Sequence, residues 1–269
     1  MKTIITHHRP HLDDICGAWL LKRFLSDFTD AKIDFIATSP TGNPHADTDE
    51  VVHIGVGRGQ FDEHKGDLED CATSLVFKFL QQTIELSEDT ERALEKIVAW
   101  VLLEDTGQLA TIEQRDFAVP AILKGEYERT DRDSGAVVIL GFQLLDALLV
   151  TQLNIVQLER DWTKRIEFES RFGSAVALSS DASSADSFAY RQGFVLLANI
   201  NNSGRYHSIR ADAKTDIDLT PVYEKLRELE PNTSWYFHHG KQMIICGGDL
   251  TPEAKPSALT LEQLVDLLK

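Results

Sequence analysis

The sequence predicts an α/β protein: a mainly parallel sheet flanked by helices in an N-terminal domain, followed by a smaller α+β C-terminal domain. Short β-branched runs alternate with a helical pattern near the start, which is typical of strand–helix–strand units. At 269 residues the chain reaches the length at which single cores stop growing and chains divide into domains. After the small polar residues at 179–187, the pattern changes to short strands and turns.

The N-terminal domain begins with three β-branched runs that are expected to form buried strands, at 3–6, 33–38 and 51–56. Between the first two, apolar residues from Ile15 to Phe24 recur at i, i+4, i+5 and i+9, which predicts a helix. Further helices are expected at 74–84 and 88–103, the second with Ser87 as its N-cap.

A long helical pattern, at 134–172, is expected to lead out of the first domain and to stop at Gly173. It exceeds the roughly 25 residues of a single globular helix, so a kink or a break is expected within it. We therefore place the domains at 1–174 and 175–269. The second domain is expected to contain strands at 194–200, 206–210, 235–238 and 243–246 and helices at 220–229 and 261–268.

Composition excludes several classes of protein. With 43 Asp and Glu against 27 Lys and Arg, the net charge of −16 argues against a surface that coats nucleic acid. The three cysteines are too few and too scattered for a disulfide framework, which favours a cytoplasmic location. The most apolar run, 135–150, is interrupted by Gln143 and Asp146 and is shorter than a spanning helix, so no membrane partner is expected.

Histidine is concentrated near the start: six of nine lie in the first 64 residues, namely His7, His8, His11, His45, His53 and His64. The segment from Thr6 to Asp14 joins the first expected strand to the first expected helix, and such loops carry the sites of parallel sheets. Imidazole and carboxylate groups are the usual ligands of Mn, Zn or Fe. We therefore expect His7, His11 and Asp13 to converge on a metal.

Other polar residues follow apolar runs in the same way. His53 stands in a strand-like run before Gly55, Asp62-Glu63-His64 comes soon after, and Glu104-Asp105 ends an apolar helix. Each has an ordinary explanation by itself, as a hydrogen-bonded core histidine, as surface charge or as a helix-end turn. Their joint occurrence favours a metal site, because buried acidic groups need a partner.

These motifs resemble those of the DHH phosphoesterase superfamily. Thr6-His7-x-x-Pro10-His11-x-Asp13 is similar to its T-H-x-x-P-D-x-D motif, Asp62-Glu63-His64 to its Asp-His-His motif, and Asp105-Thr106-Gly107 to its later D-T-G. The closest resemblance is to the branch named for the melanocyte-proliferating-gene exonuclease, whose pattern T-H-x-x-x-x-H-x-D-E also has a histidine before the aspartate. Its F-V-H strand and Gly-Gly are similar to Tyr236-Phe237-His238 and Gly247-Gly248.

The resemblance implies a metal-dependent phosphohydrolase with two divalent ions, most often Mn, with Zn or Fe as alternatives. One ion would be held by His7, His11 and His53, and the other by Asp13, His53, Glu63 and Asp105. Asp62 and His64 would be catalytic, with His64 beside the phosphorus as an acid or transition-state stabiliser. The reaction would be hydrolysis of a phosphodiester in a nucleotide or short oligonucleotide by a metal-activated water, as in a nuclease.

The resemblance also implies that the smaller domain binds the substrate, a phosphate-containing small molecule or short nucleic acid. The candidates for its phosphate are Arg205, Arg210, Lys241 and His238, of which the first two stand in a locally basic stretch.

Three positions depart from the superfamily pattern: His11 and His53 replace aspartates, and Glu63 replaces a histidine. A second hypothesis is therefore a DHH-derived module that binds a metal, a nucleotide or a protein partner without turnover. A third is hydrolysis of pyrophosphate or polyphosphate.

Overall fold

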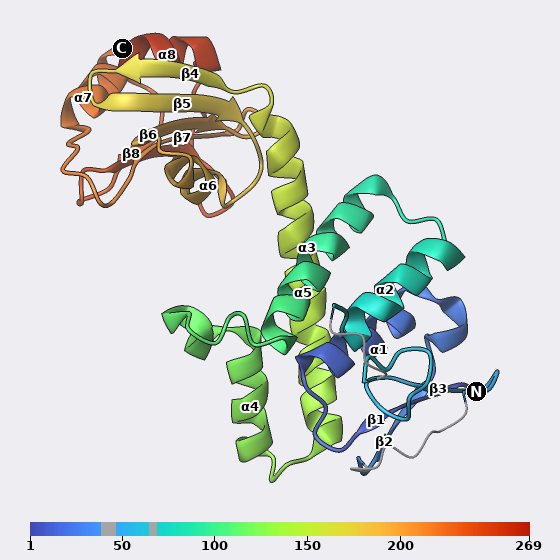
Figure 1. Ribbon diagram of the computed structural model, residues 1–269. Coiled ribbons are helices and arrows are strands. Elements are labelled where there is room, and N and C mark those ends of the chain that lie inside the picture. The colour runs from blue at the N-terminus through green and yellow to red at the C-terminus, as the bar shows by residue number, and fades with distance from the viewer. Residues whose placement is uncertain (39–46, 65–68) are drawn as a thin grey trace. The chain divides into compact units, whose positions relative to one another are not determined.

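The computed structural model describes residues 1–38, 47–64 and 69–269 (Figure 1). The chain forms two compact units, 1–153 and 154–269, which we call the first and second units. The sequence led us to expect the division at 174/175. The segment before that point joins the second unit because its strands pair with the second sheet.

The first unit is built on a three-stranded sheet of β1 (Thr3–His7), β2 (Lys32–Ile36) and β3 (Val51–His53). The strand order is β2-β1-β3, and both pairings are parallel. The expected parallel sheet is confirmed. Because β1 is the central strand, the loop that follows it leaves from the middle of the carboxyl edge of the sheet.

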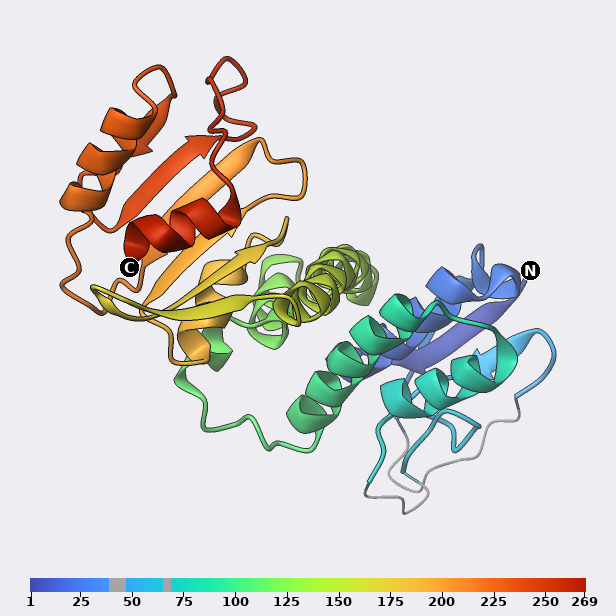
Figure 2. The ribbon, with the colours of Figure 1, turned by 90° about the horizontal axis from the view of Figure 1, so that it is seen from above.

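Helices α1 (Leu12–Phe24), α2 (Ala72–Thr83) and α3 (Glu88–Asp105) pack against one another, with the turn η1 (Ser26–Phe28) after α1 (Figure 2). Their inward faces are apolar and fully or almost fully buried, as at Ile15, Leu80 and Leu94. The Ser87 hydroxyl accepts the N–H of Thr90, which confirms the expected N-cap of α3.

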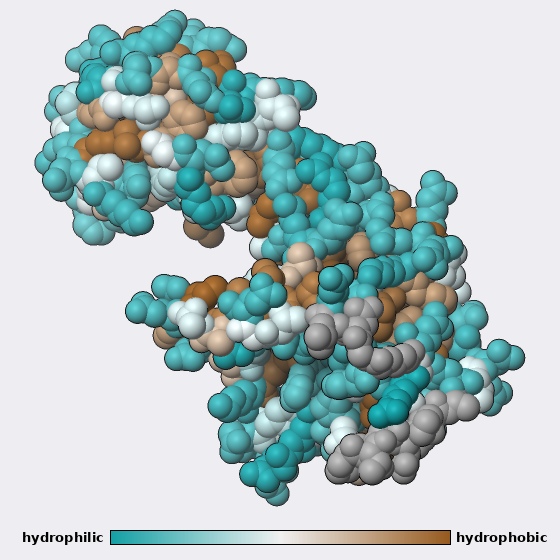
Figure 3. Space-filling view, viewed as in Figure 1, coloured by the Kyte–Doolittle hydropathy of each residue, from teal (hydrophilic) through white to brown (hydrophobic). Residues whose placement is uncertain are grey.

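Between α3 and the long helix lie the turn η2 (Glu113–Phe117) and helix α4 (Val119–Arg129), which the sequence patterns did not predict. Pro120, near the start of α4, is a residue typical of the first turn of a helix. Apolar side chains are exposed along this segment, with Phe117 at 87% and Ile112 at 46%. Figure 3 shows brown, apolar atoms on the surface there.

Helix α5 (Ser134–Trp162) is continuous over 29 residues. The prediction of helix as far as 172 is wrong: the chain turns after Trp162 and forms β4 (Ile166–Ser170) and β5 (Gly173–Ser179), an antiparallel pair. The alternating pattern Ile-Glu-Phe-Glu-Ser in β4 is a strand signal with period two, which the helical pattern before it obscured.

By length and composition α5 is able to cross a membrane. Its most apolar stretch of 18 residues has a mean hydropathy of 1.9, and 28% of that stretch is buried. Core helices of soluble proteins also meet this criterion. Within the first unit, Val137 and Leu145 are fully buried. Near the other end, Leu158 lies in a core cluster of the second unit. The absence of a membrane partner stays a prediction.

The second unit contains a six-stranded mixed sheet in the order β4-β5-β6-β7-β9-β8. Its remaining elements are α6 (Ala185–Arg191), β6 (Leu196–Ile200), β7 (Tyr206–Ala211), α7 (Thr220–Leu229), β8 (Trp235–Phe237), β9 (Met243–Gly247) and α8 (Leu261–Leu268). Apart from α6, which falls partly in the expected loop at 179–187, these match the expected elements. The smaller α+β architecture is confirmed.

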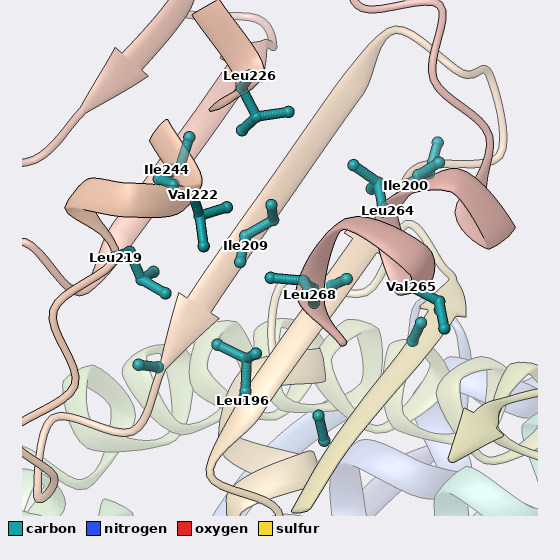
Figure 4. Packing of buried hydrophobic residues seen from close by; sticks show 14 of the residues in the cluster. Leu196, Ile200, Ile209, Leu219, Val222, Leu226, Ile244, Leu264, Val265 and Leu268 are labelled. Carbon is teal, nitrogen blue, oxygen red and sulfur yellow. The ribbon is translucent and has the colours of Figure 1, made fainter. Parts of the chain in front are cut away.

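Alternation along β6 divides the core of the second unit between the two faces of the sheet. Leu196 and Ile209 belong to a cluster with Val222 of α7 and Leu264 of α8 (Figure 4). Leu197, the next residue of β6, belongs to a second cluster that includes the end of α5 and helix α6. Successive strand side chains point to opposite faces, so each face of the sheet is covered by its own pair of helices.

Candidate metal centre

The candidate centre begins where β1 ends. His7 is the last residue of β1, His11 is the N-cap of α1, and Asp13 and Asp14 lie in the first helical turn. The backbone N–H of His11 donates to Asp14 Oδ2 over 2.8 Å, which closes a capping box. Acidic groups are favoured at a helix N-terminus because its free N–H groups are electropositive. The local sequence therefore gathers imidazoles and carboxylates at one point.

We call His7, His11 and Asp14 the histidine set, because their ligand atoms lie within 4.8 Å of one another. His7 Nε2 is 3.0 Å from Asp14 Oδ2, and the two imidazole rings meet edge to face at 5.2 Å. Burial by itself would lower the pKa of His7, but the Asp14 carboxylate outweighs it and raises the pKa to about 9. Asp14 was not among the predicted ligands; the signal was its position beside Asp13.

Gly55 makes room for Asp14. It follows β3 with φ of +62°, and a Cβ at this position would collide with Asp14 Oδ1. Glycine therefore serves two purposes here, the left-handed backbone and the close approach of a carboxylate. Gly55 thereby lets the Asp14 carboxylate approach the backbone that follows β3.

We call Asp13, Glu63 and Asp105 the acid set, because one carboxylate oxygen from each lies within 4.8 Å of the others. Burial raises the pKa of Glu63 to about 7, and the nearby Asp13 adds to this rise. Glu63 Oε2 is buried and has no hydrogen-bond partner within the described part of the chain. Three carboxylates this close repel one another unless protons or a cation compensate their charge.

Asp13 also has a structural role. Its two oxygens accept the backbone N–H groups of Ala72 and Thr73 at 2.9 and 2.8 Å, at the start of α2. Burial, followed by the charge of Asp14, raises the pKa of Asp13 to about 6. A buried carboxylate thus joins the N-termini of α1 and α2, and each oxygen keeps a lone pair for a further contact.

Asp105 reaches the acid set from the last residue of α3. The C-terminal end of a helix is electronegative, so an aspartate there is unfavourable in the absence of a cation. Burial raises the pKa of Asp105, and the charge of Asp14 raises it further. An acid at this end of a helix, facing two other acids, fits a cation-binding role better than a helix-stabilising one.

Asp62 and His64 flank Glu63. Asp62 Oδ1 lies 2.8 Å from His64 Nδ1, and Asp62 is buried while the His64 ring is 70% exposed. Burial would raise the pKa of Asp62, but the N–H groups of Arg58 and His64 outweigh it and hold the pKa below its usual value. The His64 pKa is raised: burial opposes the rise, and the Asp62 hydrogen bond outweighs it. Asp62 therefore orients the His64 ring and favours its protonated form.

Asp62, Glu63 and His64 form a third group of possible ligands, and His53 lies outside all three groups found among the described residues. It is the last residue of β3, and both its backbone N–H and its ring Nδ1 meet Asp47 Oδ1, at 2.9 and 2.8 Å. Its role as a ligand shared by two metals stays a prediction. His45 lies outside the residues that the structure describes.

The two sets together fit divalent cations. Five of the six predicted ligands belong to them, His7, His11, Asp13, Glu63 and Asp105, and Asp14 is added. Imidazole nitrogens and carboxylate oxygens are the donors that Mn, Zn and Fe accept in proteins. The raised pKa values and the unpartnered Glu63 oxygen show a surplus of negative charge that a cation would compensate.

In the second unit the predicted substrate-binding residues are dispersed. Arg210 on β7 donates to Asp186 and Tyr206 at 3.2 and 3.0 Å, and Lys241 pairs with Asp218 at 2.7 Å.

His238 Nδ1 accepts the N–H of Gly240 in the turn between β8 and β9. Arg205 stands in the turn before β7, beside Gly247, whereas Arg210 is paired in the sheet with Met243 at the other end of β9. The fold thus places Arg205 and Lys241 at opposite ends of this strand pair.

Comparisons with known proteins identify one family. The model described as "ChrB, C-terminal domain" matches residues 4–152. A search of curated proteins gives no match.

The similar solved structures include two with low TM-scores. A DHH domain described as a member of the s1p family of ribosomal proteins is 11% identical, with a TM-score of 0.31, over 99% of this chain and 85% of its own. A putative family II inorganic pyrophosphatase of Methanococcus jannaschii is 12% identical, with a TM-score of 0.22, over 100% of this chain and 99% of its own. At these values the DHH resemblance continues to rest on the sequence motifs.

Proposed function

The chain belongs to the ChrB C-terminal domain family over residues 4–152. We propose that this matched segment carries the site of a divalent-metal-dependent phosphohydrolase. The observation that carries the proposal is the adjacency of the acid set and the histidine set, joined through the consecutive residues Asp13 and Asp14. Two neighbouring groups of N and O donors suit a two-cation site better than a single structural ion. The order of the motifs along the chain, which resembles the DHH pattern, supports the same chemistry.

Each set has a distinct part in the proposal. The acid set would hold one cation and the histidine set a second, with manganese as the first metal to test. When bound, such ions supply electrostatic stabilisation of a phosphoryl group and lower the pKa of a coordinated water.

His64 is the proposed proton donor for the leaving oxygen. Its raised pKa favours the protonated imidazole, and Asp62 orients the ring. The ring is exposed at 70%, so a substrate is able to reach it. We propose a phosphodiester of a nucleotide or short oligonucleotide as the substrate.

The test uses Asp105→Asn, since Asp13 has a structural role in α2. Hydrolysis of bis-p-nitrophenyl phosphate by the full chain with Mn²⁺ is expected to fall by at least about 100-fold, the scale on which loss of a transition-state charge contact acts. Asp216→Asn, an exposed acid in the second unit, is the matched control and should retain wild-type activity. Equal activity of Asp105→Asn and wild type would contradict the proposal.

A non-enzymatic module is the second candidate. It is favoured by the occupied oxygens of Asp13 and by the contact of His53 with Asp47. Metal content by mass spectrometry, combined with the same hydrolysis assay over several divalent ions, separates the two. Bound metal without hydrolysis under any ion supports the module and excludes the enzyme.

A further inference from the structure

A pocket of about 470 Å³ lies within the first unit beside the acid set, and its wall includes Asp13 and Asp105. None of the residues that line it was predicted as a substrate-binding group. Four cationic side chains belong to the wall: Arg9, Arg115, Lys124 and Arg132. We call it the basic pocket. Its volume is in the range of small-molecule sites.

Three of the four cations are available to a ligand. Arg115 is paired with Glu104, which meets both its Nε and its Nη2. Within the described part of the chain, the side chains of Arg9, Lys124 and Arg132 have no hydrogen bond or ion pair. These three exposed side chains are therefore free to contact the phosphate of a ligand.

The rim that carries these cations is held together by two contacts between distant parts of the chain. The Tyr127 hydroxyl donates to the carbonyl of Pro10 over 2.8 Å, and the Arg9 N–H donates to Ser134 Oγ over 3.1 Å. The loop after β1 is thereby tied to α4 and to the start of α5. Arg9 and Arg132 both have left-handed backbones, with φ of 58° and 68°. Non-glycine residues in this region are uncommon and concentrate at functional sites.

The wall also contains His11, Glu104 and Glu128. Its apolar part consists of Pro10, Leu12, Val101, Pro120, Leu123 and the ring of Tyr127. A site for a bare inorganic anion would need only the cations and polar groups around it. Apolar and aromatic walls next to cations fit an organic anion with a flat or apolar body and a phosphate.

We propose that the basic pocket binds a nucleotide-sized organic phosphate, with Arg9, Lys124 and Arg132 contacting its phosphate and the apolar wall contacting its body. This inference rests on the proposed function and deepens it: the bound group is the part of the substrate that does not react, and the scissile phosphoryl group lies at the acid set. It favours an organic phosphodiester over inorganic pyrophosphate as the substrate. Arg9, Lys124 and Arg132 are then binding residues of the first unit.

The test measures binding of adenosine 5′-monophosphate to the full chain by calorimetry in excess chelator. Without a divalent ion no phosphate is held by a cation at the acid set, so binding reports the contacts of the pocket's own side chains. The double variant Lys124→Ala/Arg132→Ala should bind about 100-fold more weakly than wild type, about tenfold for each lost contact. Both positions are exposed, so folding is expected to survive, and circular dichroism checks this.

Arg129→Ala is the matched control. Arg129 lies on the same helix as Lys124, pairs with Glu126 and does not line the pocket, so binding should stay within about twofold of wild type. Inorganic phosphate and adenosine should each bind more weakly than the monophosphate.

Three results would overturn the inference: no binding by wild type, unchanged binding by the double variant, or inorganic phosphate binding as tightly as the nucleotide. The chain could also bind the nucleotide through the pocket residues and hydrolyse no phosphodiester. That result would support the binding role of the pocket and contradict the proposed function.

Discussion

Two groups of charged residues, one in each unit, differ in how their charge is compensated. In the first unit, three carboxylates approach one another at Asp13, Glu63 and Asp105, and their pKa values are all raised. In the second unit, Arg210 is paired with Asp186 and Lys241 with Asp218. The Asp218 pKa is lowered to about 2 by its hydrogen bonds from Lys241 and Thr220.

The carboxylates of the acid set face one another, whereas Asp186 and Asp218 each pair with a cation. A raised carboxylate pKa means that the folded chain disfavours the charge, so the fold alone does not stabilise the acid set in its ionised form. Bound cations would supply the missing stabilisation. The ion pairs of the second unit need no ligand, since each charge has its partner in the fold. Four predictions test this contrast.

The largest effect is expected from metal binding. Mn²⁺ at 100 times its dissociation constant should stabilise the first unit by about 2.7 kcal/mol. The melting temperature should rise by about 5–10 °C for a chain of this size. Glu63→Gln should lose most of this shift, whereas Asp186→Asn should keep it. Differential scanning fluorimetry with and without chelator measures both. If Mn²⁺ raises the melting temperatures of the two variants equally, Glu63 does not contribute to metal binding and the contrast with the second unit is contradicted.

The second prediction concerns Asp13, whose carboxylate accepts two N–H groups at the start of α2. Asp13→Ala should destabilise the metal-free chain by about 2 kcal/mol, because two buried donors lose their acceptor. Asp13→Asn keeps one acceptor oxygen and should cost about half as much. Urea unfolding followed by circular dichroism gives the comparison. If Asp13→Ala leaves the free energy of unfolding unchanged, water replaces the carboxylate as the acceptor of the two N–H groups.

The third prediction concerns pH in the metal-free state. The Glu63 pKa is raised to about 7, so the folded chain binds more protons than the unfolded chain between about pH 4.5 and 7, and stability falls as pH rises through this window.

The His7 pKa is raised to about 9; the stability from its pair with Asp14 is complete below about pH 6.5 and is lost as pH rises through 9. Both effects have the same sign. The melting temperature should fall by a few degrees between pH 5 and 9 in chelator, and Glu63→Gln should flatten the lower half of the curve. If the melting temperature of Glu63→Gln depends on pH in the same way as that of wild type, Glu63 is not the group that causes the fall.

The smallest effect is expected in the second unit. Lys241→Ala removes a largely exposed ion pair with Asp218 and should change the free energy of unfolding by less than about 1 kcal/mol. Its response to Mn²⁺ should equal that of wild type. Chemical denaturation with and without the metal checks both values. A large loss of stability would show that this pair is not an ordinary surface interaction.

Local patterns were sufficient to predict much of the first unit. The strand from Thr3, the helix that follows it, and the placement of His7, His11 and Asp13 at their junction all depend on residues close in the sequence. The turn between a parallel strand and its helix leaves few other positions for these side chains.

Long-range features were harder to predict. The end of α5 at Trp162 and the strand that follows were missed because an apolar helical pattern runs directly into an alternating one. The basic pocket was missed because Arg9 and Lys124 are 115 positions apart and show no shared motif. Their proximity depends on the contact between Tyr127 and Pro10.

The sequence by itself determined the class of the fold, the chemistry of the candidate site and most of its residues, because strand and helix periodicity and donor type are local properties. The tertiary structure alone decided that Asp14 joins the histidine set, that Asp13 also holds the start of α2, and that three unpaired cations surround the neighbouring pocket. These results depend on how distant elements pack, since burial and the distances between charges exist only once the chain is folded.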